Sequence, residues 1–168
     1  EEKSAALPVW QNELYLETHR GTYTTKGQIK KANRQLEFAL HEAEFFNAVA
    51  RQFGGESVQH QLNSAWEKVM VNQFHDIIPG SHVTEAAEDA MKLYGQAQEE
   101  VAKAAEQSLK VITGKIGGNG QIAVFNALSW ERDDLVKIAV PAGKTFTGVR
   151  DCVTGEILPC ISCGEEKE

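Results

Sequence analysis

The chain has 168 residues, of which 42% are hydrophobic, and it carries a formal net charge of −7. That apolar content is enough for one ordinary domain or two small ones, which argues against a disordered chain. The acidic balance argues against a nucleic-acid partner, because proteins that bind nucleic acid usually gather Lys and Arg into a patch. No apolar run approaches the roughly 20 residues of a membrane span, so no membrane partner is expected.

Composition changes near residue 25 and again near residue 116, and these changes divide the chain into three segments. We expect a short head over 1–25, a helical middle over 26–115 and a strand-rich tail over 121–168. The chain does not begin with Met, and it ends in GEEKE soon after a strand-like run. Both ends therefore look cut.

A first helix is predicted after the Thr- and Gly-rich stretch HRGTYTTKG. Apolar residues recur there at three- and four-residue steps, which places them on one face of a helix that ends at Gly54-Gly55. That face comprises Ile29, Leu36, Leu40, Ala43, Phe46, Ala50 and Phe53. Ser57 offers a cap for a second helix, which is expected to stop at Pro79-Gly80 because proline disfavours helix in the residue before it. Its core side comprises Val58, Leu62, Ala65, Trp66, Val69 and Gln73.

The third predicted helix is the longest and should end near Gly114. Ser81 or Thr84 can cap it, and Glu85 and Glu88 suit the positive end of its dipole. Its apolar residues alternate four and three apart, which is typical of a seam in an antiparallel bundle. The seam comprises Val83, Ala87, Ala90, Tyr94, Ala97, Val101 and Ala104. Three helices joined by short turns predict a three-helix bundle.

After the glycine-rich stretch GKIGGNG the apolar pattern changes to that of strands. Three runs fit, QIAVFNAL, DLVKIAV and FTGVRD. Three or four strands do not close a sandwich or a barrel, so the tail is expected to begin a larger β domain. The predicted fold class is mainly α, an antiparallel three-helix bundle followed by a partial antiparallel β-sheet.

All three cysteines, Cys152, Cys160 and Cys163, lie in the tail. An odd number in one short segment is a poor disulfide framework, and we interpret them as reduced thiols of an intracellular, cytoplasmic protein. Cys160 and Cys163 have C-x-x-C spacing, but no second pair completes a zinc ribbon. They are therefore interpreted as incidental.

The stretch NQFHDIIPGS, residues 72–81, places two ionisable residues, His75 and Asp76, before a Pro-Gly stop. On helical spacing, His75 falls nearly opposite the core face, on an outer side with Val71, Lys68 and Ser64. One interpretation is structural. A histidine in the last turn is favoured by the helix dipole, and an aspartate beside a Pro-Gly turn commonly accepts backbone hydrogen bonds. The other interpretation is a functional site, and spacing alone leaves both open.

Adjacent helical residues point about 100° apart, whereas helix-borne ligands to one metal ion usually lie three or four apart. His75 is therefore at most one ligand, and it has no ligand spacing with the other histidines. Any metal site would need ligands from outside this chain.

Two stretches are informative about the family through the order of their residues. ELYLETHRGTYTTKGQIKKANRQLE at 13–37 and AWEKVMVNQFHDIIPGS at 65–81 resemble glycoside hydrolase family 38, the retaining α-mannosidases. The stretch IAVFNALSWERDDLVKIAVP resembles the start of that family's C-terminal β domain. The resemblance implies that residues 1–25 end a catalytic barrel, that 26–115 form the helical middle domain and that 121–168 begin a β-sandwich domain.

The resemblance also implies site residues. In this family zinc is held by an upstream His-x-Asp, by an upstream Asp that is also the nucleophile, and by the histidine of a Q-[HF]-H-D motif. That histidine corresponds to His75, and Asp76 would face the bound sugar. His19 and Arg20 would lie near the same pocket in a substrate-facing loop, although a histidine satisfied by backbone contacts is an equal alternative for His19.

The implied activity is zinc-dependent retaining hydrolysis of terminal α-D-mannosyl linkages in oligosaccharides. No catalytic nucleophile or acid is expected within this chain, so by itself it is predicted to be inactive. Its expected partners are the oligosaccharide substrate and the rest of a parent chain, and homo-oligomers are possible. The alternative from another class is a stand-alone helical module that binds a partner protein and has no catalytic role.

Overall fold

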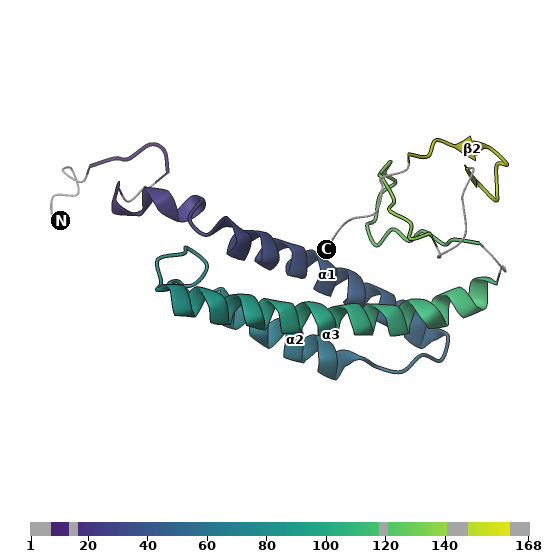
Figure 1. Cartoon of the computed structure of the whole chain (residues 1–168), viewed down its shortest axis with the longest axis horizontal. Coiled ribbons are helices and arrows are strands. Elements are labelled where there is room, and N and C mark those ends of the chain that lie inside the picture. Colours follow the sequence, from purple (N-terminus) through teal and green to yellow (C-terminus); the bar gives the residue numbers. More distant parts are fainter. Residues whose placement is uncertain (1–7, 14–16, 118–120, 141–147, 162–168) are drawn as a thin grey trace, which may run out of the picture. The chain divides into compact units, whose positions relative to one another are not determined.

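The computed structural model describes residues 8–13, 17–117, 121–140 and 148–161. The chain divides into two compact units, Glu1–Leu128 and Ser129–Glu168. In the described part of the first unit, a 3-10 helix, η2 (Glu17–Tyr23), precedes three α-helices. These are α1 (Gly27–Gln52), α2 (Gln59–Asn72) and α3 (Thr84–Ile116). Each α-helix packs against the other two, and α2 runs antiparallel to both (Figure 1). The predicted three-helix bundle is confirmed.

Among the described residues, the larger of two apolar clusters lies where the predicted faces of the three helices meet. Small residues spaced seven apart on α3, Ala90, Ala97 and Ala104, are almost fully buried and let the other helices approach closely. The larger side chains of this core are Ile29, Leu36, Leu40, Val58, Leu62, Val69, Tyr94 and Val101. The predicted face of α1 was wrong at Phe53, which is exposed just beyond the helix end.

The helix α2 ends at Asn72, earlier than the Pro79-Gly80 stop that the sequence predicted. The buried Asn72 side chain donates a hydrogen bond to the carbonyl of Ala90 at 3.0 Å, and the chain then continues in successive turns. The carbonyl of Phe74 accepts hydrogen bonds from the amides of both Ile77 and Ile78. These turns bring the two isoleucines against the core, so burial is achieved without further helix. We call residues 73–83 the α2–α3 connection.

The start of α3 also differs from the prediction. Its N-cap is Val83, in extended conformation, and no side chain caps the helix, so neither Ser81 nor Thr84 serves as the predicted cap. Val83 is exposed and does not belong to the buried seam. The helix ends at Ile116, two residues beyond the predicted Gly114.

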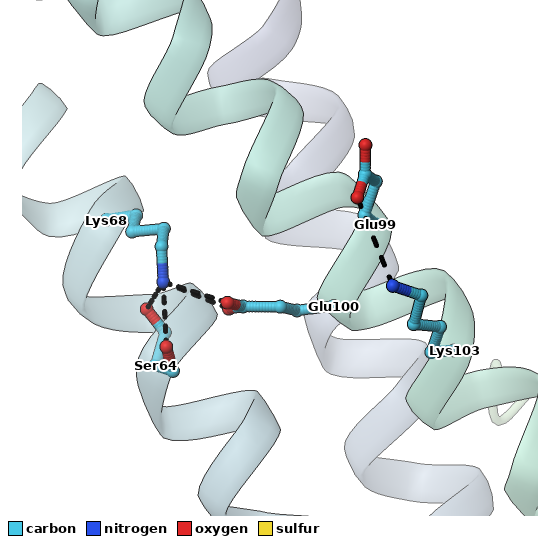
Figure 2. A network of polar contacts seen from close by, with 5 residues as sticks. All are labelled: Ser64, Lys68, Glu99, Glu100 and Lys103. Carbon is cyan, nitrogen blue, oxygen red and sulfur yellow. Dashed lines mark hydrogen bonds and ion pairs between the residues drawn. The ribbon is translucent and has the colours of Figure 1, made fainter.

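A polar network sets the register of α2 against α3 (Figure 2). The ammonium of Lys68 lies 3.0 Å from a carboxylate oxygen of Glu100 and 2.7 Å from the hydroxyl of Ser64. Lys68 and Ser64 are half-buried and face α3, so the prediction that they extend an outer stripe with Val71 was wrong. The neighbouring pair Glu99 and Lys103 is exposed, and such pairs contribute little to stability.

The described part of the second unit contains a small antiparallel hairpin of β1 (Val149–Arg150) and β2 (Ile157–Leu158), with Val149 opposite Leu158. The carboxylate of Asp151 accepts hydrogen bonds from two backbone amides of the turn, and these bonds lower the pKa of Asp151. With the bundle, this sheet confirms the predicted fold class, which is mainly α with a partial antiparallel β-sheet.

Residues 121–140 form no strand, so the predictions for QIAVFNAL and DLVKIAV were wrong in this part of the chain. Strand residues need a neighbouring strand to satisfy their backbone groups. The first run instead packs side chains on the bundle, where the rings of Phe125 and Phe46 lie 5.6 Å apart. The run FTGVRD contributes Val149–Arg150 to β1, and its first two residues lie outside the described residues.

Cys152 and Cys160 are free and exposed, whereas Cys163 lies outside the described residues. Among the helices described here, none has the length and apolar character that crossing a membrane requires.

Candidate functional site

His75 and Asp76 lie at the surface of the α2–α3 connection. Their side chains are 78% and 59% exposed, and Nε2 of His75 is 3.6 Å from Oδ2 of Asp76. The imidazole packs against the ring of Phe74, with 4.2 Å between the ring centroids. His75 is thus exposed as predicted, but the helical spacing behind that prediction does not apply, because α2 ends at Asn72 and His75 lies in a turn.

The hydrogen bonds bear on the structural interpretation of these two residues. Throughout the described ranges, no backbone amide donates to the carboxylate of Asp76, and the imidazole of His75 bonds no carbonyl at the end of α2. Apart from their contact with each other, the polar atoms of both side chains are thus available for a ligand. A single imidazole can bind a metal ion here without breaking another hydrogen bond.

The backbone beneath these exposed side chains is held by neighbouring groups. Nδ1 of His82 donates to the carbonyl of Asp76 at 2.8 Å, since a carbonyl oxygen can only accept. At the start of the connection, the Gln73 amide donates to Asn33 at 3.2 Å and to Glu37 at 3.1 Å, both on α1. The connection is therefore tied to its own end and to α1.

Three exposed apolar side chains shortly precede the pair in the sequence. Met70, Val71 and Phe74 are all more than half exposed, and we call them the apolar patch. A cluster of exposed large apolar side chains beside exposed polar groups is typical of a surface that packs against another part of a protein.

His19 and Arg20 lie in η2, where His19 has a non-helical backbone, and both side chains are exposed. The carbonyl of His19 accepts a hydrogen bond from the hydroxyl of Thr22 at 2.7 Å. The segment that follows η2 meets the α2–α3 connection where Gly80 packs on Thr25. The two stretches that carry the predicted site residues thus come together through backbone contact, although they lie more than 50 residues apart.

The structure bears on His75 as the predicted metal ligand. In the part of the chain that the structure describes, no group of three or more His, Cys, Asp or Glu side chains could hold a metal ion. Zinc usually takes about four ligands, of which neutral imidazole is a common one. His75, exposed and free of backbone bonds, fits the role of one ligand in a site that other segments complete.

The sequence missed the residues that hold the connection in place, chiefly Lys30, Gly80 and His82. Pro79-Gly80 signalled a turn, but it did not indicate close packing against Thr25. Lys30 contacts the carbonyl of Ile78, 48 residues away, and no local pattern predicts a contact at that separation.

A family model of the α-mannosidase middle domain matches residues 17–112. The match begins at η2, includes α1, α2 and the connection, and extends through most of α3. The chain belongs to the α-mannosidases of glycoside hydrolase family 38. The resemblance that was based on residues 13–37 and 65–81 is thereby confirmed.

Individual α-mannosidases share the same region. Alpha-mannosidase 2C1 of Mus musculus is 35% identical over 148 residues, which cover 85% of this chain. Its Homo sapiens counterpart is 36% identical over the same length, and alpha-mannosidase G of Dictyostelium discoideum is 36% identical over 110 residues, or 66% of this chain. The matched region spans 14% of the mouse and human proteins and 10% of the Dictyostelium protein.

Proposed function

We propose that this chain supplies the helical middle domain of a zinc-dependent retaining α-mannosidase that hydrolyses terminal α-D-mannosyl linkages in oligosaccharides. In this proposal residues 1–25 complete a catalytic barrel and residues 121–168 begin a β-sandwich domain. Membership of the α-mannosidase family supports the reaction class. The observation that carries the proposal for the site is the exposure of His75 and Asp76 on a connection whose backbone is held.

His75 would hold the zinc ion together with ligands from the upstream part of the full-length protein. When bound, zinc would act as a Lewis acid and bind neighbouring hydroxyl groups of the mannoside. The carboxylate of Asp76 accepts hydrogen bonds from sugar hydroxyls and orients the ring. In the described structure Asp76 accepts no hydrogen bond from a backbone amide, and its side-chain contact is with His75, which supports this role.

His19 and Arg20 would line the sugar pocket from η2. A guanidinium group donates N–H hydrogen bonds, and Arg20 would use this chemistry to bind hydroxyl oxygens of the sugar. The nucleophile and the general acid would come from the upstream barrel. The 168 residues alone would therefore not turn over substrate.

The apolar patch would pack against the rest of the parent chain. The alternative, a stand-alone interaction module, would use the same patch for a separate partner protein. Family membership favours the first possibility, because the matched relatives extend far beyond this region. We also propose a cytoplasmic location, which the free thiols of Cys152 and Cys160 support.

The test is a His75→Ala variant of the full-length protein. We expect bound zinc and kcat/KM for an aryl α-mannoside each to fall at least about 100-fold, because losing a ligand costs more than losing a residue that supports one. In the 168-residue chain, the midpoint of urea unfolding should barely change, since the His75 side chain is exposed there. Metal analysis measures the bound zinc, steady-state kinetics measures kcat/KM, and urea unfolding measures stability.

His60→Ala is the matched control, because His60 is an exposed histidine near the start of α2. It should leave zinc content and rate unchanged. A His75→Ala variant that retains zinc but loses stability would show that His75 is a structural residue.

A further inference from the structure

The ammonium of Lys30, on α1, binds the backbone of the α2–α3 connection. It donates hydrogen bonds to the carbonyls of Ile78 at 2.9 Å and Pro79 at 3.3 Å. It also donates to the carbonyl of Thr25 at 2.7 Å. An ammonium group has three N–H donors, so these bonds account for all of them. Lys30 thereby joins the connection to the segment between η2 and α1.

No carboxylate lies within ion-pair distance of Lys30 among the described residues. The side chain is half-buried, and the removal of water from around it lowers the pKa of Lys30. An ordinary surface lysine keeps its ammonium group in solvent. Lys30 instead places its charge among backbone carbonyls, where the partial negative charges of three oxygens stabilise it.

A second lysine supports the end of the same connection. Lys26 is the N-cap of α1 and has a left-handed backbone conformation, with φ 50°. Its ammonium donates to the carbonyls of His82 at 3.0 Å and Val83 at 3.4 Å. The two lysines therefore bind carbonyls at successive points of the connection, just beyond His75 and Asp76.

The backbone packs closely at the point that Lys30 bridges. Gly80 is buried with φ 83°, and a Cβ atom added to it would lie 2.9 Å from the carbonyl oxygen of Thr25. Only glycine fits that approach without moving one of the two segments. The contact and the Lys30 bridge hold together the same pair of segments, one after η2 and one after Asp76.

We propose that Lys30 is a positioning residue for the site, which fixes the backbone that carries His75 and Asp76 relative to the segment that carries His19 and Arg20. This inference rests on the proposed function, because positioning has a catalytic meaning only if His75 and Asp76 act in the site. Exposed side chains on an unsupported turn would sample many positions, and a metal ligand must be held close to one.

The first measurement is amide hydrogen exchange in the 168-residue chain, with Lys30→Met and Lys30→Arg compared with the unchanged protein. The informative amides are those of Ile77, Ile78 and Gly80, which are hydrogen-bonded within the connection. Lys30→Met, which keeps the apolar stem, should speed their exchange about tenfold or more. Lys30→Arg should restore part of the protection. The amides of α3 should exchange as before.

The second measurement uses the full-length protein. Lys30→Met should weaken zinc affinity and lower kcat for an aryl α-mannoside about 10- to 100-fold, as loss of a residue that supports a metal ligand usually does. Lys30→Arg should recover both in part. Lys31→Met is the matched control, because Lys31 is the exposed neighbour on α1, and it should change neither quantity.

Unchanged exchange in Lys30→Met would overturn the proposal. Faster exchange with zinc affinity and kcat unchanged would overturn it as well, while leaving the proposed function intact. A fully active His75→Ala variant would instead refute the proposed function. If Lys30→Met does not fold, Gly80→Ala tests the same junction from its other side, and unaltered zinc affinity in that variant would overturn the proposal.

Discussion

At the residue scale, Tyr94 shows how burial changes the chemistry of a side chain in the core. It lies on α3 with only 2% of its surface exposed, and its hydroxyl donates to the side-chain oxygen of Asn33 at 3.4 Å. Burial raises the pKa of Tyr94 to about 12, and the negative charge of Glu37 adds to the effect. The phenolate is therefore disfavoured in the folded bundle.

This shift predicts a loss of stability at alkaline pH. Between the unfolded pKa near 10 and the folded pKa of about 12, the folded state keeps a proton that the unfolded state releases. The Tyr94 contribution is thus fully present below pH ~10, and about 2 to 3 kcal/mol of it is lost as pH rises through the folded pKa. Urea unfolding of the chain at several pH values between 8 and 12 measures it.

The control for this prediction is Tyr94→Phe, which keeps the ring and removes the titrating group. Its stability should fall less steeply over the same range, because it lacks the phenol whose pKa the fold raises. If the difference between the two proteins stayed constant with pH, Tyr94 would not be the group responsible.

At the element scale, α3 contains a glycine that its structure does not require. Gly95 is exposed in the interior of this 33-residue helix, and an added Cβ would meet nothing within 4 Å. Glycine loses more backbone freedom than alanine when a helix forms. The helix therefore has a local weak point on its solvent side.

Replacing Gly95 by alanine should raise the free energy of unfolding by about 0.5 to 1 kcal/mol. For a bundle of this size, that gain corresponds to an increase in Tm of a few degrees, roughly 2 to 8 °C. Thermal unfolding followed by circular dichroism measures the change. Gly80→Ala is the opposite case and should lower Tm, because its Cβ would lie 2.9 Å from the Thr25 carbonyl oxygen. A lower Tm for Gly95→Ala would contradict the explanation.

The elements also show where local patterns mislead. The helical spacing of α2 continues past Asn72 in the sequence, since Ile77 and Ile78 are apolar, yet these residues reach the core through turns. The run QIAVFNAL has the short apolar stretch of a strand, but Phe125 packs on the bundle. In both cases the apolar residues indicate that the segment is buried. Its backbone conformation depends instead on which neighbours it packs against.

At the scale of the whole molecule, the chain contains a complete helical core and only part of the proposed site. Ile29, Leu62 and Ala97 are each almost fully buried within the bundle, whereas His75 and Asp76 point out of it. The bundle is therefore able to fold around its own core, while the proposed zinc site depends on other segments of the parent protein.

This division predicts the behaviour of the isolated 168 residues. They should show the helical circular dichroism of the bundle but should bind no zinc at micromolar metal, because one imidazole cannot replace about four ligands. They should also release no product from an aryl α-mannoside. Isothermal titration with zinc and a colorimetric assay check both statements, with the His75→Ala chain as the baseline. Turnover by the purified chain would contradict the proposed division of the site.

The sequence by itself determined the three helices, most of their buried faces and the family. Each rests on short-range information, since helical spacing repeats within four residues and the family motif lies in stretches such as NQFHDIIPGS. The predicted exposure of His75 agrees with the structure, but the helix on which that prediction rested ends at Asn72.

Only the tertiary structure decided where α2 ends, how α3 begins and what holds the α2–α3 connection. Lys30 reaches carbonyls 48 and 49 residues away, and Gly80 fits against Thr25. Contacts of this kind depend on how α1 and the connection meet in space, and a periodic pattern carries no information about that meeting. For the same reason, the apolar run at 121–128 became a packed segment once the bundle offered Phe46 as a neighbour.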